Sequence, residues 1–171
     1  MKTPLCDFCL KSGVLCPKCQ EKTRSGQITD TDMRIAKLLV TFQDSYPSLQ
    51  QITFYKAYNA NGVLAILVGQ GDLPHLLGYG GKILRELAQQ TGKNIRILEK
   101  GGSIRKLLED LLSPATITSL NTIWLPDGTT ETRVIITDHP RKLPMKAEAL
   151  KEIVQKVQGT TIRVEFERKR R

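Results

Sequence analysis

The sequence of 171 residues predicts an α+β protein in which two similar units follow a small cysteine-rich segment. Segments with helical spacing of apolar residues alternate with short β-rich runs over residues 30–167. The stretch 92–97 (GKNIRI) returns as residues 159–164 (GTTIRV), 67 positions later. A repeat of this length indicates a duplicated domain, and each copy is expected to have a three-stranded sheet with helices on one face.

The cysteine-rich segment, residues 1–24, contains the pairs Cys6-x-x-Cys9 and Cys16-x-x-Cys19. Four thiolates in two such pairs favour tetrahedral binding of Zn²⁺. The segment is too short to bury a core, so a structural metal would supply its folding energy. The six-residue gap is short for a zinc ribbon and indicates a reduced ribbon or knuckle that reverses at Gly13. A redox-active pair, an iron–sulfur cluster and disulfides are the alternatives, of which a cytoplasmic location disfavours disulfides.

The first unit, residues 30–100, begins with a helix over residues 31–44 that Thr29 or Asp30 can cap and that Pro47 ends. Two strands over residues 52–58 and 63–68 flank the turn signal Asn61-Gly62. A glycine-rich loop, a helix to about residue 90 and a strand over residues 94–99 complete the unit.

The glycine-rich loop, Gly78-Tyr79-Gly80-Gly81, lies between two short helical segments. Because glycine has no Cβ, the backbone of a ligand can approach closely there, and the N–H groups of the following helix favour phosphate. Positive charge is expected at the helix start and further along the unit, from Lys82, Arg85, Lys93 and Arg96. An ordinary glycine-rich turn would show the same local pattern, so the interpretation depends on its surroundings.

The second unit, residues 101–167, repeats the order of elements. We expect a helix over residues 104–112, strands over 117–125 and 131–137, a helix over 145–157 and a strand over 160–167. In place of the glycine-rich loop the chain reads HPRKLPM from His139 to Met145. Because proline has no N–H group, this loop is not expected to form a backbone clamp.

Net charge and hydropathy indicate which kinds of partner to expect. The charge of +9 indicates a polyanionic partner, and four of the positive charges form the C-terminal run Arg168, Lys169, Arg170 and Arg171. Such a tail contacts nucleic acid through counterion release, or it only aids solubility. The longest apolar run, residues 63–68, is too short to cross a bilayer, and the N-terminus has no apolar signal region. We therefore expect a cytoplasmic protein without a membrane partner.

The order of elements, together with the pattern Leu-Gly-x-Gly-Gly-Lys-x-x-Arg from residue 77 and Thr-Gly-Lys from residue 91, resembles a known family. It is similar to the tandem type II KH domains of archaeal NusA-like transcription factors over residues 30–167. The resemblance implies binding of single-stranded RNA or rRNA, about four nucleotides per competent unit. It assigns RNA contacts to the loop, and the charge of the chain adds the four basic residues named above and the tail. The family usually has a basic residue in the middle of the loop, where this chain has Tyr79-Gly80.

Catalysis is not expected, because the sequence has no Walker loop, no serine–histidine arrangement and no paired acids in a catalytic context. The main alternative to an RNA-binding factor is an adaptor that docks on RNA polymerase or the ribosome and uses the KH folds as a scaffold. A thiol redox enzyme is a third possibility, and it would require a reactive, metal-free cysteine pair.

Overall fold

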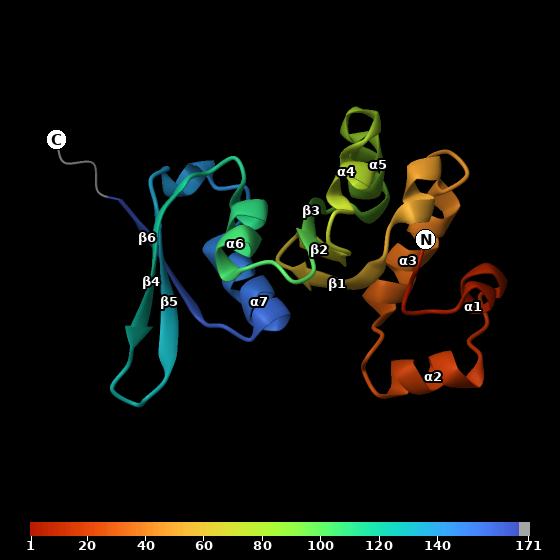
Figure 1. Cartoon of the computed structure of the whole chain (residues 1–171), viewed down its shortest axis with the longest axis horizontal. Coiled ribbons are helices and arrows are strands. Elements are labelled where there is room, and N and C mark those ends of the chain that lie inside the picture. The colour runs from red at the N-terminus through yellow and green to blue at the C-terminus, as the bar shows by residue number, and fades with distance from the viewer. Residues whose placement is uncertain (168–171) are drawn as a thin grey trace. The chain divides into compact units, whose positions relative to one another are not determined.

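The computed structural model describes residues 1–167, which form two compact units, residues 1–101 and the part of the chain from Gly102 onward (Figure 1). Each unit has a three-stranded mixed sheet packed with helices, and a four-cysteine cluster precedes the first sheet. The predicted α+β class is therefore confirmed. Within residues 1–167, no helix has the length and apolar character needed to cross a membrane.

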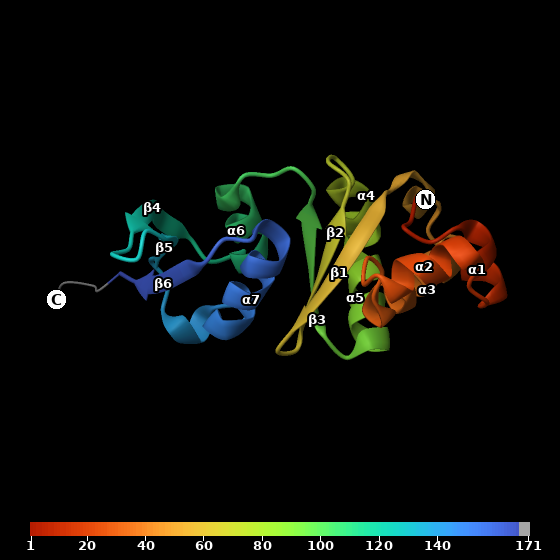
Figure 2. The ribbon, with the colours of Figure 1, turned by 90° about the horizontal axis from the view of Figure 1, so that it is seen from below.

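In the first unit, strand β1 (Phe54–Ala60) is antiparallel to β2 (Val63–Val68), and β2 is parallel to β3 (Asn94–Glu99). Helices pack on one face of this sheet (Figure 2). They are α3 (Asp30–Phe42), α4 (Leu73–Leu77) and α5 (Lys82–Thr91), accompanied by the 3₁₀ turns η1 (Pro47–Gln51) and η2 (Tyr79–Gly81).

Helix α3 is fixed at its first turn. Thr29 and Asp32 form a capping box, in which the Thr29 hydroxyl accepts from the Asp32 N–H and the Asp32 carboxylate accepts from the Thr29 N–H. The Asp32 side chain is buried, and its second oxygen accepts from the Ala57 N–H of β1 at 2.6 Å. One carboxylate therefore caps the helix and ties it to the sheet.

The cysteine segment belongs to the same compact unit as the first sheet. Leu5, Cys9, Leu10 and Cys19 are buried in one continuous core with the apolar faces of α3, α5 and β2. Lys2 also forms a parallel bridge with Thr53 just before β1. The expected boundary at residue 24 thus lies inside one packed body rather than between two.

The chain reverses at Gly13 as expected, but the reversal joins two helices and not the strands of a ribbon. Residues 1–24 contain two short helices, α1 (Asp7–Ser12) and α2 (Pro17–Arg24), and Gly13 ends α1 in the left-handed conformation, with φ of 75°. The physical reason is that each CxxC pair starts a helix, with its first cysteine at the N-cap and its second in the first turn.

The second unit has the same topology. Strand β4 (Ile117–Trp124) is antiparallel to β5 (Thr130–Ile136), which is parallel to β6 (Ile162–Phe166). Helices α6 (Ile104–Leu112) and α7 (Ala147–Gln158) pack on one face of this sheet, and the 3₁₀ turn η3 (Pro140–Lys142) precedes α7 (Figure 1). Ser103 caps α6 by accepting from the Lys106 N–H.

The sequence repeat corresponds to a structural repeat. Gly92 and Gly159 each end the helix before the last strand, with φ of 66° and 68°. The first strand of each unit carries a register irregularity near its start, between Phe54 and Lys56 in one unit and between Ile117 and Ser119 in the other. The two units thus share their helix ends and their strand pairing as well as the repeated sequence.

Candidate nucleic-acid interface and metal centre

The glycine-rich loop has three successive residues in the left-handed region. Tyr79, Gly80 and Gly81 have φ of 56°, 64° and 73°. Helix α4 ends just before them, where the Gly78 N–H donates to the Pro74 carbonyl, and the Gly81 N–H donates back to the Gly78 carbonyl. The loop is therefore a compact reversal between α4 and α5, as the sequence predicted.

Gly80 and Gly81 are the glycines of this loop that adopt the left-handed conformation. A Cβ built at Gly80 or Gly81 would meet nothing within 4 Å, so the space above both residues is open. Gly78 has φ of −52°, and its Cβ would only touch two backbone carbonyls at ordinary contact distance. The open surface into which the backbone of a ligand can approach is thus at Gly80 and Gly81.

Helix α5 starts directly after the loop with Gly81 as its N-cap, and no side chain within residues 1–167 caps it. The Lys82 N–H donates to the Tyr79 carbonyl, and the helix dipole favours a negative group at this end of α5. Lys82 is exposed at the first helical position. Arg85 donates from Nη2 to the Gly80 carbonyl at 3.2 Å, so it braces the loop as well as adding charge.

Two of the predicted basic residues lie apart from the loop. Lys93 follows α5, whose ten residues span about 15 Å, and it donates to the Asn59 side chain at 2.8 Å. Arg96 lies on β3 between Ile95 and Ile97, which pack toward the helices, so it faces the opposite side of the sheet. Burial lowers the pKa of Arg96. The predicted tail residues 168–171 lie outside the described residues.

From the sequence, the walls of an RNA-binding groove are expected at Ile83, Leu84, Leu87 and the strand near Ile95 to Ile97, and this expectation needs a correction. Ile83, Leu87 and Ile97 are buried in the core, where they pack α5 against the sheet, so they cannot line an open groove. Leu84 and Ile95 are only partly buried and remain available beside the loop helix.

Tyr46 and Glu86 were not predicted, yet they position the loop. The Tyr46 ring lies against the Tyr79 ring, with centroids 5.1 Å apart, and its hydroxyl donates to Glu86 Oε1 at 2.5 Å. The hydrogen bond to Glu86 and burial raise the pKa of Tyr46. Tyr46 precedes the helix-stopping Pro47, and Glu86 has the pattern of a solvated helix position, so no local sequence signal pairs them.

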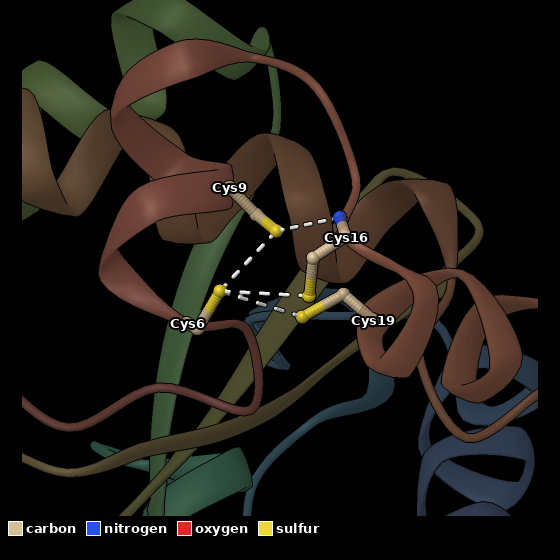
Figure 3. Close-up of side chains that lie close together, drawn as sticks. All are labelled: Cys6, Cys9, Cys16 and Cys19. Atoms are coloured by element: carbon tan, nitrogen blue, oxygen red, sulfur yellow. Dashed lines mark hydrogen bonds between the residues drawn. The ribbon is translucent and has the colours of Figure 1, made fainter.

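The four predicted metal ligands converge. The sulfur atoms of Cys6, Cys9, Cys16 and Cys19 all lie within 4.8 Å of one another, and the four are free cysteines (Figure 3). Cys6 Sγ lies 3.2 Å from Cys9 Sγ, 3.9 Å from Cys16 Sγ and 3.8 Å from Cys19 Sγ. Tetrahedral zinc with Zn–S bonds of about 2.3 Å requires sulfur separations of about 3.8 Å. The cluster is able to hold a metal ion of this kind.

Backbone N–H groups at the two helix N-termini interact with sulfur atoms of this cluster, but the net shift in pKa differs between the thiols. The Cys16 N–H donates to Cys9 Sγ at 3.0 Å and lowers the pKa of Cys9, but burial and the Cys6 thiol outweigh it and raise that pKa to about 12. The Cys19 backbone and the Cys9 thiol lower the pKa of Cys16 to about 7. Four thiolates this close repel one another unless a cation compensates them, so the donor set fits a bound metal.

The corresponding loop of the second unit has a different conformation. No residue from Thr137 to Lys146 has a positive φ. His139 caps η3 by accepting from the Arg141 N–H at its Nδ1, and Pro140 occupies the first position of that turn. The loop therefore does not reproduce the open left-handed backbone of Gly80 and Gly81.

Comparison with known proteins gives a fold but no family. No known protein-family profile matches the chain, and no curated protein matches it. A solved structure described as "Crystal structure of APE1850" is similar, with a TM-score of 0.54 and 18% sequence identity. The match covers 77% of this chain and 96% of that chain. At this identity the likeness establishes a shared fold alone.

Proposed function

We propose that this chain is a non-catalytic, cytoplasmic RNA-binding protein of the NusA-like tandem KH class, and that its first unit clamps the backbone of single-stranded RNA. The observation that carries the proposal is the open left-handed backbone at Gly80 and Gly81, placed directly before the uncapped start of α5. A GxxG loop that clamps the nucleic-acid backbone is the recognition element of KH domains.

The surroundings of the loop support this function. The exposed Lys82 side chain and the positive end of the α5 dipole favour phosphate at the loop. Because Tyr79 stands where the family usually has a basic residue, one phosphate contact is missing from the loop. We therefore expect binding that is weaker than that of a fully basic loop.

The double variant Gly80→Asp/Gly81→Asp tests the clamp. It places two negative charges and two side chains where phosphate would lie. Binding to single-stranded RNA should fall well beyond tenfold, and tenfold corresponds to about 1.4 kcal/mol. The measurement is a fluorescence-anisotropy titration with short unstructured RNA. Aspartate tolerates the left-handed region better than most residues, and a Cβ at either position meets nothing within 4 Å, so the unit should stay folded.

The matched control is Gln89→Asp/Gln90→Asp, which makes the same charge change at two exposed positions of α5. These positions lie about 13 Å along the helix from the loop, beyond the Debye length of about 10 Å at 0.1 M salt. The control should lose little affinity. Equal losses in both variants would mean that only net charge matters, and wild-type affinity in the loop variant would refute the clamp.

We also propose that the four-cysteine cluster holds a structural Zn²⁺. Cys6, Cys9, Cys16 and Cys19 would be its ligands, and zinc would neutralise the thiolates and link α1 to α2. Elemental analysis of protein purified without chelator should find about one zinc per chain. Protein without metal, or with the absorbance of an iron–sulfur cluster, would contradict the assignment.

A second candidate function, an adaptor docked on RNA polymerase or the ribosome, is favoured by the second unit. Residues 102–167 have nine basic and nine acidic side chains, so this unit offers little attraction for RNA. Trp124, at the end of the β4–β5 hairpin, is 77% exposed, and exposed tryptophans frequently anchor protein interfaces. Co-sedimentation with purified ribosomes or RNA polymerase, compared between wild type and Trp124→Ala, tests this function. Equal binding by both proteins would count against it.

A further inference from the structure

Tyr79 is an exposed aromatic residue in the middle of the loop. Its φ of 56° is unfavourable for a bulky side chain, yet the residue occupies this conformation between Gly78 and Gly80. The side chain is 52% exposed, so a substantial part of the ring is in contact with solvent. A basic residue at this position would serve phosphate binding, whereas an uncharged ring serves another kind of contact.

The orientation of the Tyr79 ring is fixed from one side. Tyr46 packs against it at a ring angle of 58°, and Tyr46 is held in turn by Glu86 of α5 and by the edge-on ring of Phe42. The Glu86 carboxylate, which would repel phosphate, is engaged by the Tyr46 hydroxyl. The ring of Tyr79 is therefore held in place before any ligand arrives, with its remaining surface open.

We propose that Tyr79 stacks on an unpaired nucleobase of the RNA whose backbone lies over Gly80 and Gly81. This inference rests on the proposed clamp function. The nucleotide next to the clamped phosphate is within reach, because the ring belongs to the residue adjacent to Gly80. An aromatic ring held in advance loses little conformational freedom on binding, which strengthens the contact. Every base has a π-face, so the stacking tolerates sequence, with a preference for purines from their larger overlap.

Two variants separate stacking from other effects of the side chain. Tyr79→Phe keeps the ring, and Tyr79→Leu keeps apolar bulk without the ring, while both replace one side chain at a positive φ by another. Tyr79→Phe should bind RNA within about threefold of wild type, and Tyr79→Leu should bind between about fivefold and a hundredfold more weakly. Equal affinity of the two variants would overturn the proposal.

An abasic scan identifies the base. Short RNA oligonucleotides, each with one abasic nucleotide, are titrated against wild type and Tyr79→Leu. At one position the missing base should weaken wild-type binding by a factor similar to the Tyr79→Leu effect. The same abasic nucleotide should weaken binding to Tyr79→Leu by less than about twofold, because the contact is already gone. Additive losses at every position would contradict stacking.

A fluorescence readout is independent of affinity. The chain has a single tryptophan, Trp124, so the variant Trp124→Phe/Tyr79→Trp carries its only indole in the loop. Binding of intact RNA should quench this indole, and the oligonucleotide with the identified abasic nucleotide should not. No quenching by RNA that binds would overturn the stacking proposal.

The clamp and the stacking contact fail in different ways. If Gly80→Asp/Gly81→Asp abolishes binding while Tyr79→Leu binds as wild type, the clamp stands and the stacking is wrong. If neither change weakens binding, the clamp itself is wrong, and the stacking proposal falls with it.

Discussion

The two units share an order of elements, a sheet topology and left-handed glycines at matching helix ends, but they differ between the second strand and the next helix. In the first unit this segment forms α4 and the open loop at Gly80 and Gly81. In the second it forms the proline-bounded turn η3 without any positive φ. The two units thus share the features that build the scaffold and differ in the loop before the last helix.

The two units also differ in net charge. Residues 1–101 have 13 basic and eight acidic side chains, whereas residues 102–167 have nine of each. In the second unit, two of the cations are paired across the sheet, Arg133 with Glu165 and Arg163 with Glu131. The net charge of the whole chain therefore comes from the first unit and from the four-residue tail. Under the proposed function, this difference would assign the electrostatic attraction for RNA to the first unit and the tail rather than to the second unit.

Removal of the proposed zinc should produce the largest difference in stability between the two units. Cys9 and Cys19 are buried in the core that also contains α3 and α5, so loss of the metal leaves this core without one of its supports. Structural zinc contributes about 10–16 kcal/mol in small domains, comparable with the whole stability of a domain. We expect chelation, or Cys19→Ala, to increase amide exchange across residues 1–60.

Hydrogen exchange followed by mass spectrometry checks this expectation, and peptides from residues 102–167 of the same molecule provide the control. Their protection should change little, because the cysteine cluster belongs to the other unit. Unchanged protection of α3 after verified metal loss would show that the cluster is not a structural support of the first unit.

Substitutions at the helix caps should produce smaller losses of stability, and the loss should be larger in the first unit than in the second. Asp32→Ala leaves the buried Ala57 N–H without its acceptor and removes the Asp32 half of the α3 capping box, while the Thr29 hydroxyl still caps the helix. We expect a loss of about 2 kcal/mol, because an unsatisfied buried donor costs about 1–3 kcal/mol and the Thr29 N–H also loses its acceptor. The equivalent helix of the second unit has only the Ser103 cap, so Ser103→Ala should cost about 1 kcal/mol.

Urea unfolding followed by residue-resolved NMR measures each unit separately. Asp32→Asn is the conservative variant, since it keeps an acceptor for the Ala57 N–H and should retain part of the lost stability. A loss in Asp32→Ala no larger than in Ser103→Ala would show that the link between α3 and β1 is not important for stability.

The sequence predicted the features that arise from local chemistry. The alternation of β-rich runs around Asn61-Gly62 located β1 and β2 to within two residues, and β3 has the predicted bounds. Thr29 was available as a cap because threonine satisfies the first N–H groups of a helix. The spacing of the cysteine pairs was sufficient to bring four sulfur atoms together.

Contacts between distant residues could not be predicted in this way. Tyr46 meets Glu86, 40 residues away, only because α3 and α5 pack on the same face of the sheet. Likewise, Arg96 was grouped with the loop because a basic residue can contact phosphate. Strand alternation, however, places Arg96 on the face of the sheet opposite the helices. The two helices of residues 1–24 were missed because their short length gives no clear periodicity.

Deletion of the C-terminal tail should produce the smallest effect on RNA affinity. Together with its control, it tests whether the second unit contacts RNA. Deletion of residues 168–171 removes four positive charges. If all four contact phosphates, the slope of log affinity against log salt should become shallower by about 3 for single-stranded RNA. Affinity should fall at low salt, while the ranking of different RNA sequences stays unchanged, because screened Coulomb contacts carry no sequence information.

The matched control for the tail removes four exposed positive charges from the second unit by changing Arg141, Lys142, Lys146 and Lys151 to Gln. Because η3 offers no open backbone for a clamp, this variant should leave the salt slope close to that of the full chain. A slope that flattens as much as in the tail deletion would show that the second unit also lies along the RNA, and the division between the units would be lost. A tail deletion that leaves the slope unchanged would instead show that the tail does not touch RNA, and this result would favour the adaptor function.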